Sequence, residues 1–427
     1  MKTKACMKIS ILCFLFSLWV NPVRSQTYFP PLAGNQWDTL SVDRFGYCQD
    51  RIDSLYNFLD ENNSKGFILL REGKIVLEKY FDDFTQDSNW YWASAGKTLT
   101  AAVIGVLESK NALSITDKTS KYLGSGWTSL PQNKEDSITI WHQLTMTTGL
   151  DDSPTSADCT DPKCLTYKAP VGKRWAYHNA PYTLLDGVIS SASGKTLNQL
   201  LFSEFTANTG MKVLYLKLGY NNVAFSTPRS FARFGLLLLN KGKWNSTQLI
   251  PLSYYNKMVV SSQEMNPSYG YLTWLNGKDH FMVPQSQFRF SGDCVTTGPS
   301  DLIMALGKDG QQIHISPSRN MVWIRMGEAP DTQSPLVSMD LGTKIWEQIN
   351  ALSCNAAALN FPDSDNQQLY PNPISPGQVL HGNGEFLMDA SGRKFPLINN
   401  EIPIELTEGI YQVKTSKGYK KIAVLNP

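Results

Sequence analysis

A β-hairpin with an amphipathic helix beside it is predicted near both ends of a long segment, residues 43–352. In the first pair the helix precedes the hairpin, and in the second pair it follows. The residues between the two pairs, roughly 110–285, read as helices and long loops. This order of elements predicts an α+β fold with two lobes. The predicted elements are a helix over 43–62, strands over 67–70 and 75–80 that turn at Glu72-Gly73, strands over 311–315 and 321–326, and a helix over 336–352.

Two further segments have clear helical patterns. Residues 94–109 are apolar on almost every side, which is typical of a helix that is buried all round. Residues 230–240 form the second helix. A chain with these elements has enough apolar length to bury a core.

The composition is that of a globular protein. Hydrophobic residues make up 42% and charged residues 18% of the chain, which excludes a disordered or fibrous protein.

Residues 1–25 combine a basic start, an apolar stretch and no acidic residue, and therefore predict a secretory signal peptide; an uncleaved anchor is the alternative. No basic run is long enough to follow a phosphate backbone, so no nucleic-acid partner is expected. We expect the protein to be secreted or displayed on the cell surface, via the periplasm.

Five of the seven cysteines follow the signal segment. In an oxidising compartment an odd number permits at most two disulfides and one free thiol. Cys159 and Cys164 are the easiest pair to close. A C-x4-C pair without a second pair or histidine ligands gives little support for zinc, and we predict neither a metal nor a cofactor.

The composition changes after Cys354. Residues 355–367 are polar and interrupted by proline, as linkers are. Residues 368–427 carry short alternating runs separated by Gly and Asn, which predict a small antiparallel β domain. The predicted organisation is therefore a signal peptide (1–25), a catalytic domain (26–354), a linker (355–367) and the C-terminal domain (368–427). The expected strands of that last domain are 385–388, 402–406, 410–413 and 421–425.

Several common catalytic motifs do not occur in the sequence. There is no G-x-S-x-G, no H-E-x-x-H and no G-x-G-x-x-G that opens a helix. The Gly-Lys-Thr triplets at Gly96 and Gly194 lack the upstream glycine of a phosphate loop. These absences exclude the enzyme classes that depend on those motifs.

Ser94 and Lys97 stand where a polar loop turns into the buried helix. Their i, i+3 spacing puts both side chains on one helical face. A serine hydroxyl needs a base, and a lysine in a desolvated pocket loses affinity for its proton and can serve as that base. The N–H groups at a helix N-terminus suit an oxyanion. A surface Ser and Lys on a first helical turn is the alternative for this short motif.

Two other segments carry residues that could support such a serine. A phenol at Tyr177 near a lysine ammonium can have a depressed pKa and share proton transfer, and the amide of Asn179 can bind both the lysine and a substrate carbonyl. At Lys308 a positive charge is available for a substrate carboxylate, Gly310 lets substrate approach closely, and the N–H of Gln311 can complete an oxyanion hole. The alternatives are a packed loop aromatic and an ordinary hairpin entry.

In this order the three segments resemble the motifs of the serine β-lactamase and penicillin-binding superfamily. The resemblance is to its class C branch, with the D-alanyl carboxypeptidases, family esterases and 6-aminohexanoate-dimer hydrolases. It covers about residues 45–353 and includes LTMTTGLDD (144–152) and FARFGLLLLNKGKW (231–244). It implies a two-lobed β-lactamase/DD-peptidase-like fold, in which an antiparallel sheet flanked by helices adjoins a mostly helical lobe.

The resemblance also implies roles for individual residues. Ser94 would be the nucleophile, Lys97 and Tyr177 the proton relay, and Asn179 a positioning residue, with an oxyanion hole from the backbone of Ser94 and Gln311. The first and last helices of such proteins pack side by side, which implies a Cys48–Cys354 disulfide and leaves Cys294 free.

Two departures from the superfamily pattern bear on the substrate. Asp309 replaces the usual Thr or Ser, and Gly96 replaces the usual Ser or Thr before the lysine. Both favour an esterase or amidase, acting on a small-molecule or peptide-like substrate, over a β-lactamase. A true β-lactamase or D-alanyl carboxypeptidase, and an inactive binding module for peptidoglycan-type ligands, remain as alternatives.

The C-terminal segment resembles a second known unit. LYPNPISPGQ (369–378), DASGRK (389–394) and LTEGIYQVKTSKGYKKIAVL (406–425) are similar to the C-terminal sorting domain of type IX secretion in Bacteroidota, a β-sandwich. This resemblance implies that the secretion machinery is a partner of residues 368–427. An accessory carbohydrate-binding or stability domain is the alternative.

Overall fold

The structure is a computed structural model that describes residues 27–153, 155, 157–330 and 338–354, and the C-terminal segments 386–388, 394–397, 409–415 and 418–424. The chain divides into two compact units, Met1–Cys354 and Asn355–Pro427, and each is described by itself. The predicted signal peptide and linker lie outside the described residues.

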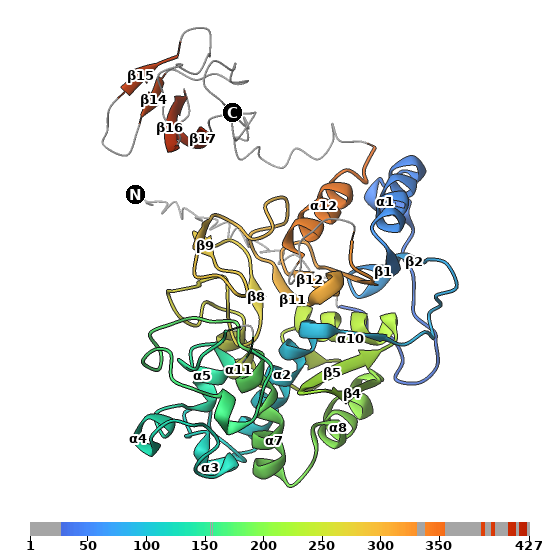
Figure 1. Cartoon of the computed structure of the whole chain (residues 1–427). Coiled ribbons are helices and arrows are strands. Elements are labelled where there is room, and N and C mark those ends of the chain that lie inside the picture. The colour runs from blue at the N-terminus through green and yellow to red at the C-terminus, as the bar shows by residue number, and fades with distance from the viewer. Residues whose placement is uncertain are drawn as a thin grey trace, which may run out of the picture. The chain divides into compact units, whose positions relative to one another are not determined.

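A six-stranded antiparallel sheet is the centre of one lobe of the first unit (Figure 1). Its strand order is β2-β1-β13-β12-β11-β8. The two predicted hairpins are confirmed, and they join through β1 and β13, with Leu69 opposite Trp323. The strands are β1 (Ser64–Arg71), β2 (Lys74–Tyr80), β8 (Trp274–Leu275), β11 (Ile303–Leu306), β12 (Gln312–Ser316) and β13 (Met321–Gly327).

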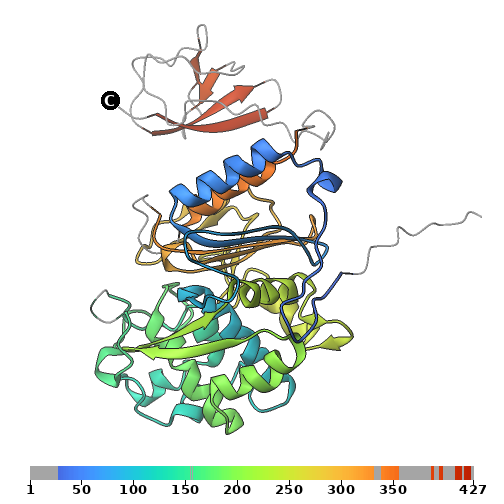
Figure 2. The same cartoon turned by 90° about the vertical axis from the view of Figure 1, so that its right-hand side faces the viewer.

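Helices cover both faces of this sheet (Figure 2). On one face α1 (Gln49–Glu61) and α12 (Met339–Asn350) lie side by side, and on the other lies α10 (Pro228–Leu239). A Cβ at Gly235 would come within 2.6 Å of Val322, so glycine lets α10 sit directly on the strands. The predicted first helix is divided, because Gly46 adopts a left-handed φ of 65° and separates a short 3₁₀ turn, Val42–Phe45, from α1.

The other lobe contains the remaining helices and a three-stranded sheet, order β3-β5-β4. The sequence predicted helices here but missed these strands. The helices are α2 (Gly96–Ser109), α3 (Ser120–Leu123), α4 (Gln132–Glu135), α5 (Ile140–Leu144), α6 (Asn179–Thr183), α7 (Leu185–Ser193), α8 (Leu197–Leu200), α9 (Ala207–Thr209) and α11 (Leu252–Met258). The strands of the three-stranded sheet are β3 (Trp90–Tyr91), β4 (Val213–Leu218) and β5 (Asn221–Ser226). Two short strand pairs belong to neither sheet: β6 (Lys243–Trp244) with β7 (Thr247–Gln248), and β9 (His280–Phe281) with β10 (Phe290–Ser291).

The cysteines pair as expected. Cys48, at the start of α1, is bonded to Cys354, after α12, with their Cα atoms 5.7 Å apart. Cys159 is bonded to Cys164, and Cys294 is buried and free. The Cys48–Cys354 bond fastens the start of α1 to the segment that follows α12.

Removing the Cys48–Cys354 disulfide should destabilise the protein much more than removing the short one. The long bridge spans a sequence separation of 306 and the short one of 5. In the chain-entropy description the losses are about 5 kcal/mol at most and roughly 2 kcal/mol, respectively. Urea unfolding of the paired variants Cys48→Ser/Cys354→Ser and Cys159→Ser/Cys164→Ser measures both. Equal losses would contradict the expectation.

The second unit contains a four-stranded antiparallel sheet, order β15-β14-β16-β17. The small antiparallel β domain is therefore confirmed at the level of these strands, while the sandwich remains a prediction and the expected strand 402–406 lies outside the described residues. The strands are β14 (Phe386–Met388), β15 (Lys394–Pro396), β16 (Gly409–Thr415) and β17 (Gly418–Val424).

Among the described residues, no helix has both the length and the apolar character that crossing a membrane requires.

Candidate active site

Ser94 and Lys97 meet at the entry to α2. Ser94 lies in a 3₁₀ turn, Ala93–Ala95, that leads directly into the helix. Because a 3₁₀ turn has three residues per turn, side chains at i and i+3 eclipse each other, and Lys97 Nζ donates a hydrogen bond to Ser94 Oγ at 2.9 Å. The preceding residue, Ala93, has a left-handed φ of 47°, a strained conformation of the kind that clusters at functional sites. The predicted serine–lysine pair is thus in contact.

Lys97 is buried without a countercharge in contact. Its residue is only 4% exposed, and its Nζ lies 5.0 Å from the ring centroid of Tyr177 and 4.4 Å from that of Tyr182. No described carboxylate forms an ion pair with it. Burial lowers the pKa of Lys97 to about 7, and the charge of Asp158 opposes that shift. The amine is therefore available as a base near neutral pH.

Tyr177 is held by aromatic side chains just before α6. Its ring stacks on Trp274 at a centroid distance of 5.9 Å and meets the edge of Tyr269 at 6.1 Å. Burial raises the pKa of Tyr177, and a hydrogen bond with Ser94 acts weakly in the opposite direction. The expected depression of the Tyr177 pKa is therefore wrong, because desolvation outweighs any nearby positive charge. Tyr177 stays a phenol and can pass on a proton but cannot begin as the base.

Asn179 contacts a carboxylate rather than the lysine. Its Nδ2 donates to Asp158 Oδ1 at 2.7 Å. A carboxylate only accepts hydrogen bonds, which fixes the orientation of the amide. The Asn179 Oδ1 atom is buried and has no hydrogen-bond partner among the described residues. It remains available as an acceptor for a group that enters the site.

Hydrogen bonds from the buried side chain of Arg325 stabilise the turn at residues 308–311. This buried guanidinium donates to the carbonyl oxygens of Asp309, at 2.6 Å, and Gly310, at 3.1 Å. Tyr91 donates its hydroxyl to Asp309 Oδ2 at 2.5 Å. Lys308 is exposed, as a residue that attracts a substrate carboxylate should be. Asp309 and Gly310 adopt φ values of 60° and 73°, so the turn has a left-handed backbone that needs this support.

Gln311 lies deeper than the expected oxyanion hole requires. Its side chain exchanges two hydrogen bonds with the backbone of Gly327, at 2.6 and 3.1 Å, and its N–H faces the carbonyl of Lys308 at 3.4 Å. The glycine that touches the serine turn is Gly307, where a Cβ would lie 2.4 Å from the carbonyl oxygen of Trp92. Gly310 instead faces Arg325.

Two backbone N–H groups beside the nucleophile lack acceptors. Within the described part of the chain, neither the N–H of Ser94 nor that of Lys308 donates a hydrogen bond. Gly307 packs on the serine turn, since a Cβ there would lie 3.1 Å from the backbone nitrogen of Ala95. The Lys308 N–H, which follows Gly307, is therefore a candidate for the second oxyanion donor, whereas the Gln311 N–H is directed at the Lys308 carbonyl.

Sequence reasoning missed several residues that shape this site. Gly307 directly precedes the predicted segment and could have been found there. The others belong to elements that no short motif connects to Ser94. They are Tyr91, Asp158, Tyr182 and Arg325.

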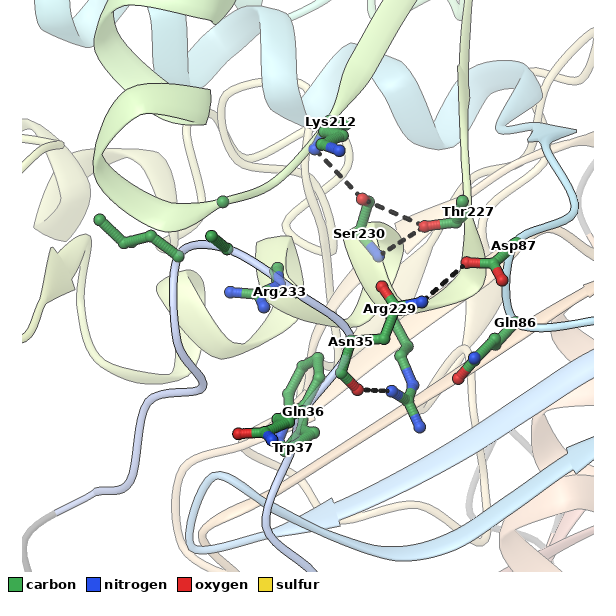
Figure 3. A pocket seen from close by; sticks show the side chains of 14 residues that line it. Asn35, Gln36, Trp37, Gln86, Asp87, Lys212, Thr227, Arg229, Ser230 and Arg233 are labelled. Carbon is green, nitrogen blue, oxygen red and sulfur yellow. Dashed lines mark hydrogen bonds between the residues drawn. The ribbon is translucent and has the colours of Figure 1, made fainter.

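A separate cavity of about 320 Å³ lies between residues 32–37 and the start of α10 (Figure 3). The buried Arg233 donates to the carbonyl oxygen of Pro31 at 2.7 Å, and Arg229 makes a two-point ion pair with Glu78. Both guanidinium groups thus bind protein acceptors. This cluster holds residues 31–35 in place. None of the residues around Ser94 lines the cavity.

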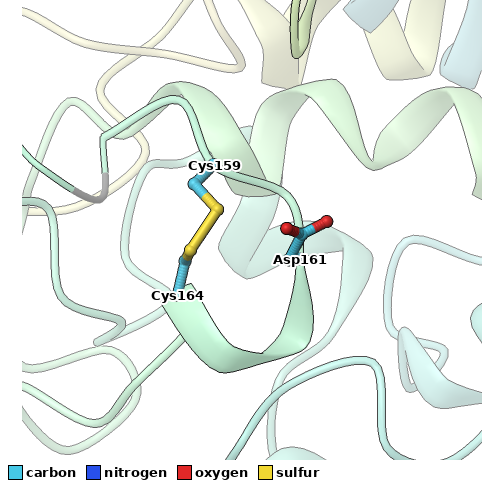
Figure 4. Close-up of side chains that lie close together, drawn as sticks. All are labelled: Cys159, Asp161 and Cys164. Carbon is cyan, nitrogen blue, oxygen red and sulfur yellow. A yellow bond between two sulfur atoms is a disulfide. The ribbon is translucent and has the colours of Figure 1, made fainter.

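Cys159, Asp161 and Cys164 are the one group of possible metal ligands found among the described residues (Figure 4). The two sulfur atoms are bonded to each other, so no thiolate is available to bind a metal. Asp161 also accepts a hydrogen bond from Tyr220 at 2.9 Å. The group is a disulfide-closed loop.

Comparisons with known proteins agree with this geometry. Residues 64–324, more than half of the chain, match the family described as Beta-lactamase. None of the curated proteins matches the sequence.

Solved structures share the fold at low sequence identity. A Bacillus anthracis protein assigned as a 6-aminohexanoate-dimer hydrolase is 20% identical, with a TM-score of 0.57 over 76% of this chain and 89% of that one. A protein of Bacteroides dorei assigned as a β-lactamase is 18% identical, with a TM-score of 0.57 over 72% and 99%. A family VIII carboxylesterase is 13% identical, with a TM-score of 0.53 over 72% and 99%.

Proposed function

Because this chain belongs to the β-lactamase family, we propose that it is a serine hydrolase that cleaves an ester or amide through an acyl-enzyme on Ser94. The observation that carries the proposal is the 2.9 Å hydrogen bond from Lys97 Nζ to Ser94 Oγ in a buried site. A neutral amine at that distance is placed to remove the serine proton.

The proposed reaction has two halves. Lys97 takes the proton of Ser94, whose Oγ attacks the substrate carbonyl carbon, and the N–H groups of Ser94 and Lys308 stabilise the oxyanion. Tyr177 then passes the proton to the leaving alcohol or amine as the ester or amide bond breaks. In the second half Lys97 and Tyr177 take a proton from a water, and the water oxygen attacks the acyl carbon. The bond between the acyl carbon and Ser94 Oγ then breaks, the same proton returns to Oγ, and the carboxylic acid leaves.

An ester or amide without a β-lactam ring is the substrate class we favour. Asp309 places a negative charge next to Lys308, which weakens attraction for the carboxylate that β-lactams and D-alanyl peptides carry. Activity-based labelling and hydrolysis assays with esters, amides, D-Ala-D-Ala peptides and β-lactams separate these classes. Faster turnover of β-lactams than of esters would favour a true β-lactamase, and no turnover at all would favour an inactive binding module.

We further propose that residues 1–25 direct export and that residues 368–427 act as a sorting domain for the type IX secretion machinery. The support is the resemblance of the tail and the division of the chain into two compact units at Cys354.

Truncation after Asn355 should separate transport from catalysis. A domain that has its own core contributes little to the stability of the neighbouring domain across a linker. We therefore expect kcat/KM of the shortened protein to stay within about threefold of the full chain. In a host with type IX secretion the shortened protein should accumulate in the periplasm. Lost hydrolysis, or unchanged surface delivery, would instead indicate an accessory domain.

A further inference from the structure

A second cavity, of about 250 Å³, lies between the start of α7 and the hairpin β4–β5. None of the residues assigned to the candidate active site lines it. Its volume is below the roughly 300–1,000 Å³ of a pocket for a drug-sized ligand, so it suits a compact molecule. The polar residues that line the cavity are Thr160, Thr183, Asp186, Lys217, Tyr220 and Asn222.

Two opposite charges line this cavity without forming an ion pair. Lys217 follows the buried Tyr215 by two positions on β4, so both side chains lie on the same face of the hairpin. Asn222 is opposite Lys217 in the strand register, and its Nδ2 donates to Asp186 Oδ2. No ion pair to Asp186 or Lys217 occurs within the described residues. The cavity therefore offers a carboxylate and an ammonium group to one ligand.

The carboxylate of Asp186 is held in place, and its charge is only partly compensated. Burial raises the pKa of Asp186 to about 6, while the hydrogen bond from Asn222 and the charge of Lys217 oppose this shift. A cation that binds the carboxylate directly would stabilise its charged form. Because the Asn222 amide already fixes the side chain, less entropy is lost when a ligand binds.

A buried hydroxyl adds a third polar group to the cavity. Thr183 Oγ1 is buried and forms no hydrogen bond with a described residue. A buried polar group without a partner costs free energy, and a hydroxyl can both donate and accept. Since Thr183 lines the cavity, a ligand can supply the missing partner there.

We propose that this cavity binds a small α-amino acid in its zwitterionic form. The ammonium group of the ligand pairs with Asp186, and its carboxylate pairs with Lys217 and accepts a hydrogen bond from Thr183. A ligand with a single charge satisfies only one of the two charged side chains. The inference goes beyond the proposed hydrolase function and does not depend on it.

Two phenols connect the surroundings of this cavity to Lys97. The ring centroid of Tyr182 lies 4.4 Å from Lys97 Nζ, and Tyr215 donates its hydroxyl to the carbonyl oxygen of Gly96 at 2.6 Å. Burial raises the pKa of both phenols, and the charge of Asp186 adds to the shift. The amino acid therefore binds next to residues that pack around Lys97, but outside the catalytic site.

Calorimetric titration of the full-length protein with glycine, L-alanine and L-serine tests the proposal. Glycine has five non-hydrogen atoms, and the best tiny ligands gain about 1.5 kcal/mol for each, so its Kd cannot be tighter than a few micromolar. We expect a Kd between about 10 µM and 1 mM for the best of the three. Acetate and ethylamine, which carry one charge each, should bind at least about tenfold more weakly.

Matched variants identify the groups that bind. Asp186→Asn keeps the shape and an acceptor for Asn222 but removes the negative charge, and Lys217→Met removes the positive charge from an exposed position. Each should weaken amino-acid binding by about 10- to 100-fold, the range for a hydrogen bond to a charged group. Lys195→Met, at an exposed position just beyond the end of α7, should bind like the parent protein. Unchanged affinity in Lys217→Met, or equal weakening in Lys195→Met, would overturn the proposal.

Ser94 separates this cavity from the catalytic site in the same titration. Because Ser94 does not line the cavity, Ser94→Ala and the protein labelled with a fluorophosphonate should bind the amino acid as tightly as the parent. Binding that is lost in either form would place the amino acid in the catalytic site and refute the second site. No heat of binding with any of the three amino acids at about 10 mM would refute it as well. Failure to hydrolyse any ester would count against the hydrolase proposal alone.

Discussion

Replacing Ser94 with alanine should lower kcat by on the order of 10⁴ to 10⁶ on any substrate that the protein turns over, because the members of a coupled nucleophile–base unit act together. The variant should also lose the single adduct that a fluorophosphonate forms with the parent protein. Intact-mass spectrometry and steady-state kinetics measure the two effects.

Ser94→Ala should fold like the parent protein, so that a loss of activity reports the loss of the nucleophile. Ser94 Oγ accepts a hydrogen bond from Lys97 Nζ, and the alanine removes one polar atom from a half-buried position. Ser109→Ala, at the far end of the same helix, is a matched control that should keep full activity and labelling. If Ser94→Ala is labelled as strongly as the parent, another residue is the nucleophile.

The local elements of this protein could be predicted because each one follows its own periodicity. The hairpin β1–β2 turns at Glu72 and Gly73, which adopt φ values of 56° and 84°, and Gly in such a turn is a strong local signal. The strands β4 and β5 were missed although they are neighbours in the sequence and pair with each other from Val213–Ser226 to Leu218–Asn221. Their residues do not alternate strictly between apolar and polar, and they lie in a region with many helices, so no local pattern marks them as strands.

In the candidate site, too, contacts set by local geometry could be predicted, whereas contacts set by the tertiary fold could not. Ser94 and Lys97 are three residues apart, so helix geometry alone brings them together. Lys308 and Gly310 were chosen by motif, whereas contact with the serine turn depends on how β11 ends, and this places Gly307 there instead. The sign of the Tyr177 pKa shift was also out of reach, because it depends on Trp274 and Tyr269 from another element.

Lys97 links the chemistry of the site to its stability. An amine that is buried among aromatic rings is costly to keep charged, and the same cost lowers its pKa to about 7. Activity and stability should therefore respond in opposite directions when this side chain becomes apolar. That expectation distinguishes a catalytic lysine from one that merely supports the fold.

Lys97→Met should reduce kcat/KM by about 10⁴-fold and at the same time raise Tm. In the parent, kcat/KM should rise with pH up to about 7, tenfold per pH unit below that value, because only the neutral amine is a base. The variant should lose this dependence. Tyr177→Phe should retain the acidic limb, and the double variant should lose less than the sum of the two losses in log kcat/KM, since the residues share one proton path.

The stability difference should itself depend on pH. Between about pH 7 and the ordinary lysine value of 10.5, the unfolded chain binds more protons at this position than the folded one, so the parent gains stability as pH rises through that window. Below pH 7 the parent bears the full cost of a buried charge, and Lys97→Met should be more stable by on the order of 3 kcal/mol, or about 5 °C in Tm. Above about pH 10.5 the advantage should vanish. A methionine variant that is less stable than the parent at pH 6, or a parent whose activity is flat from pH 5 to 8, would show that Lys97 is charged and structural rather than the base.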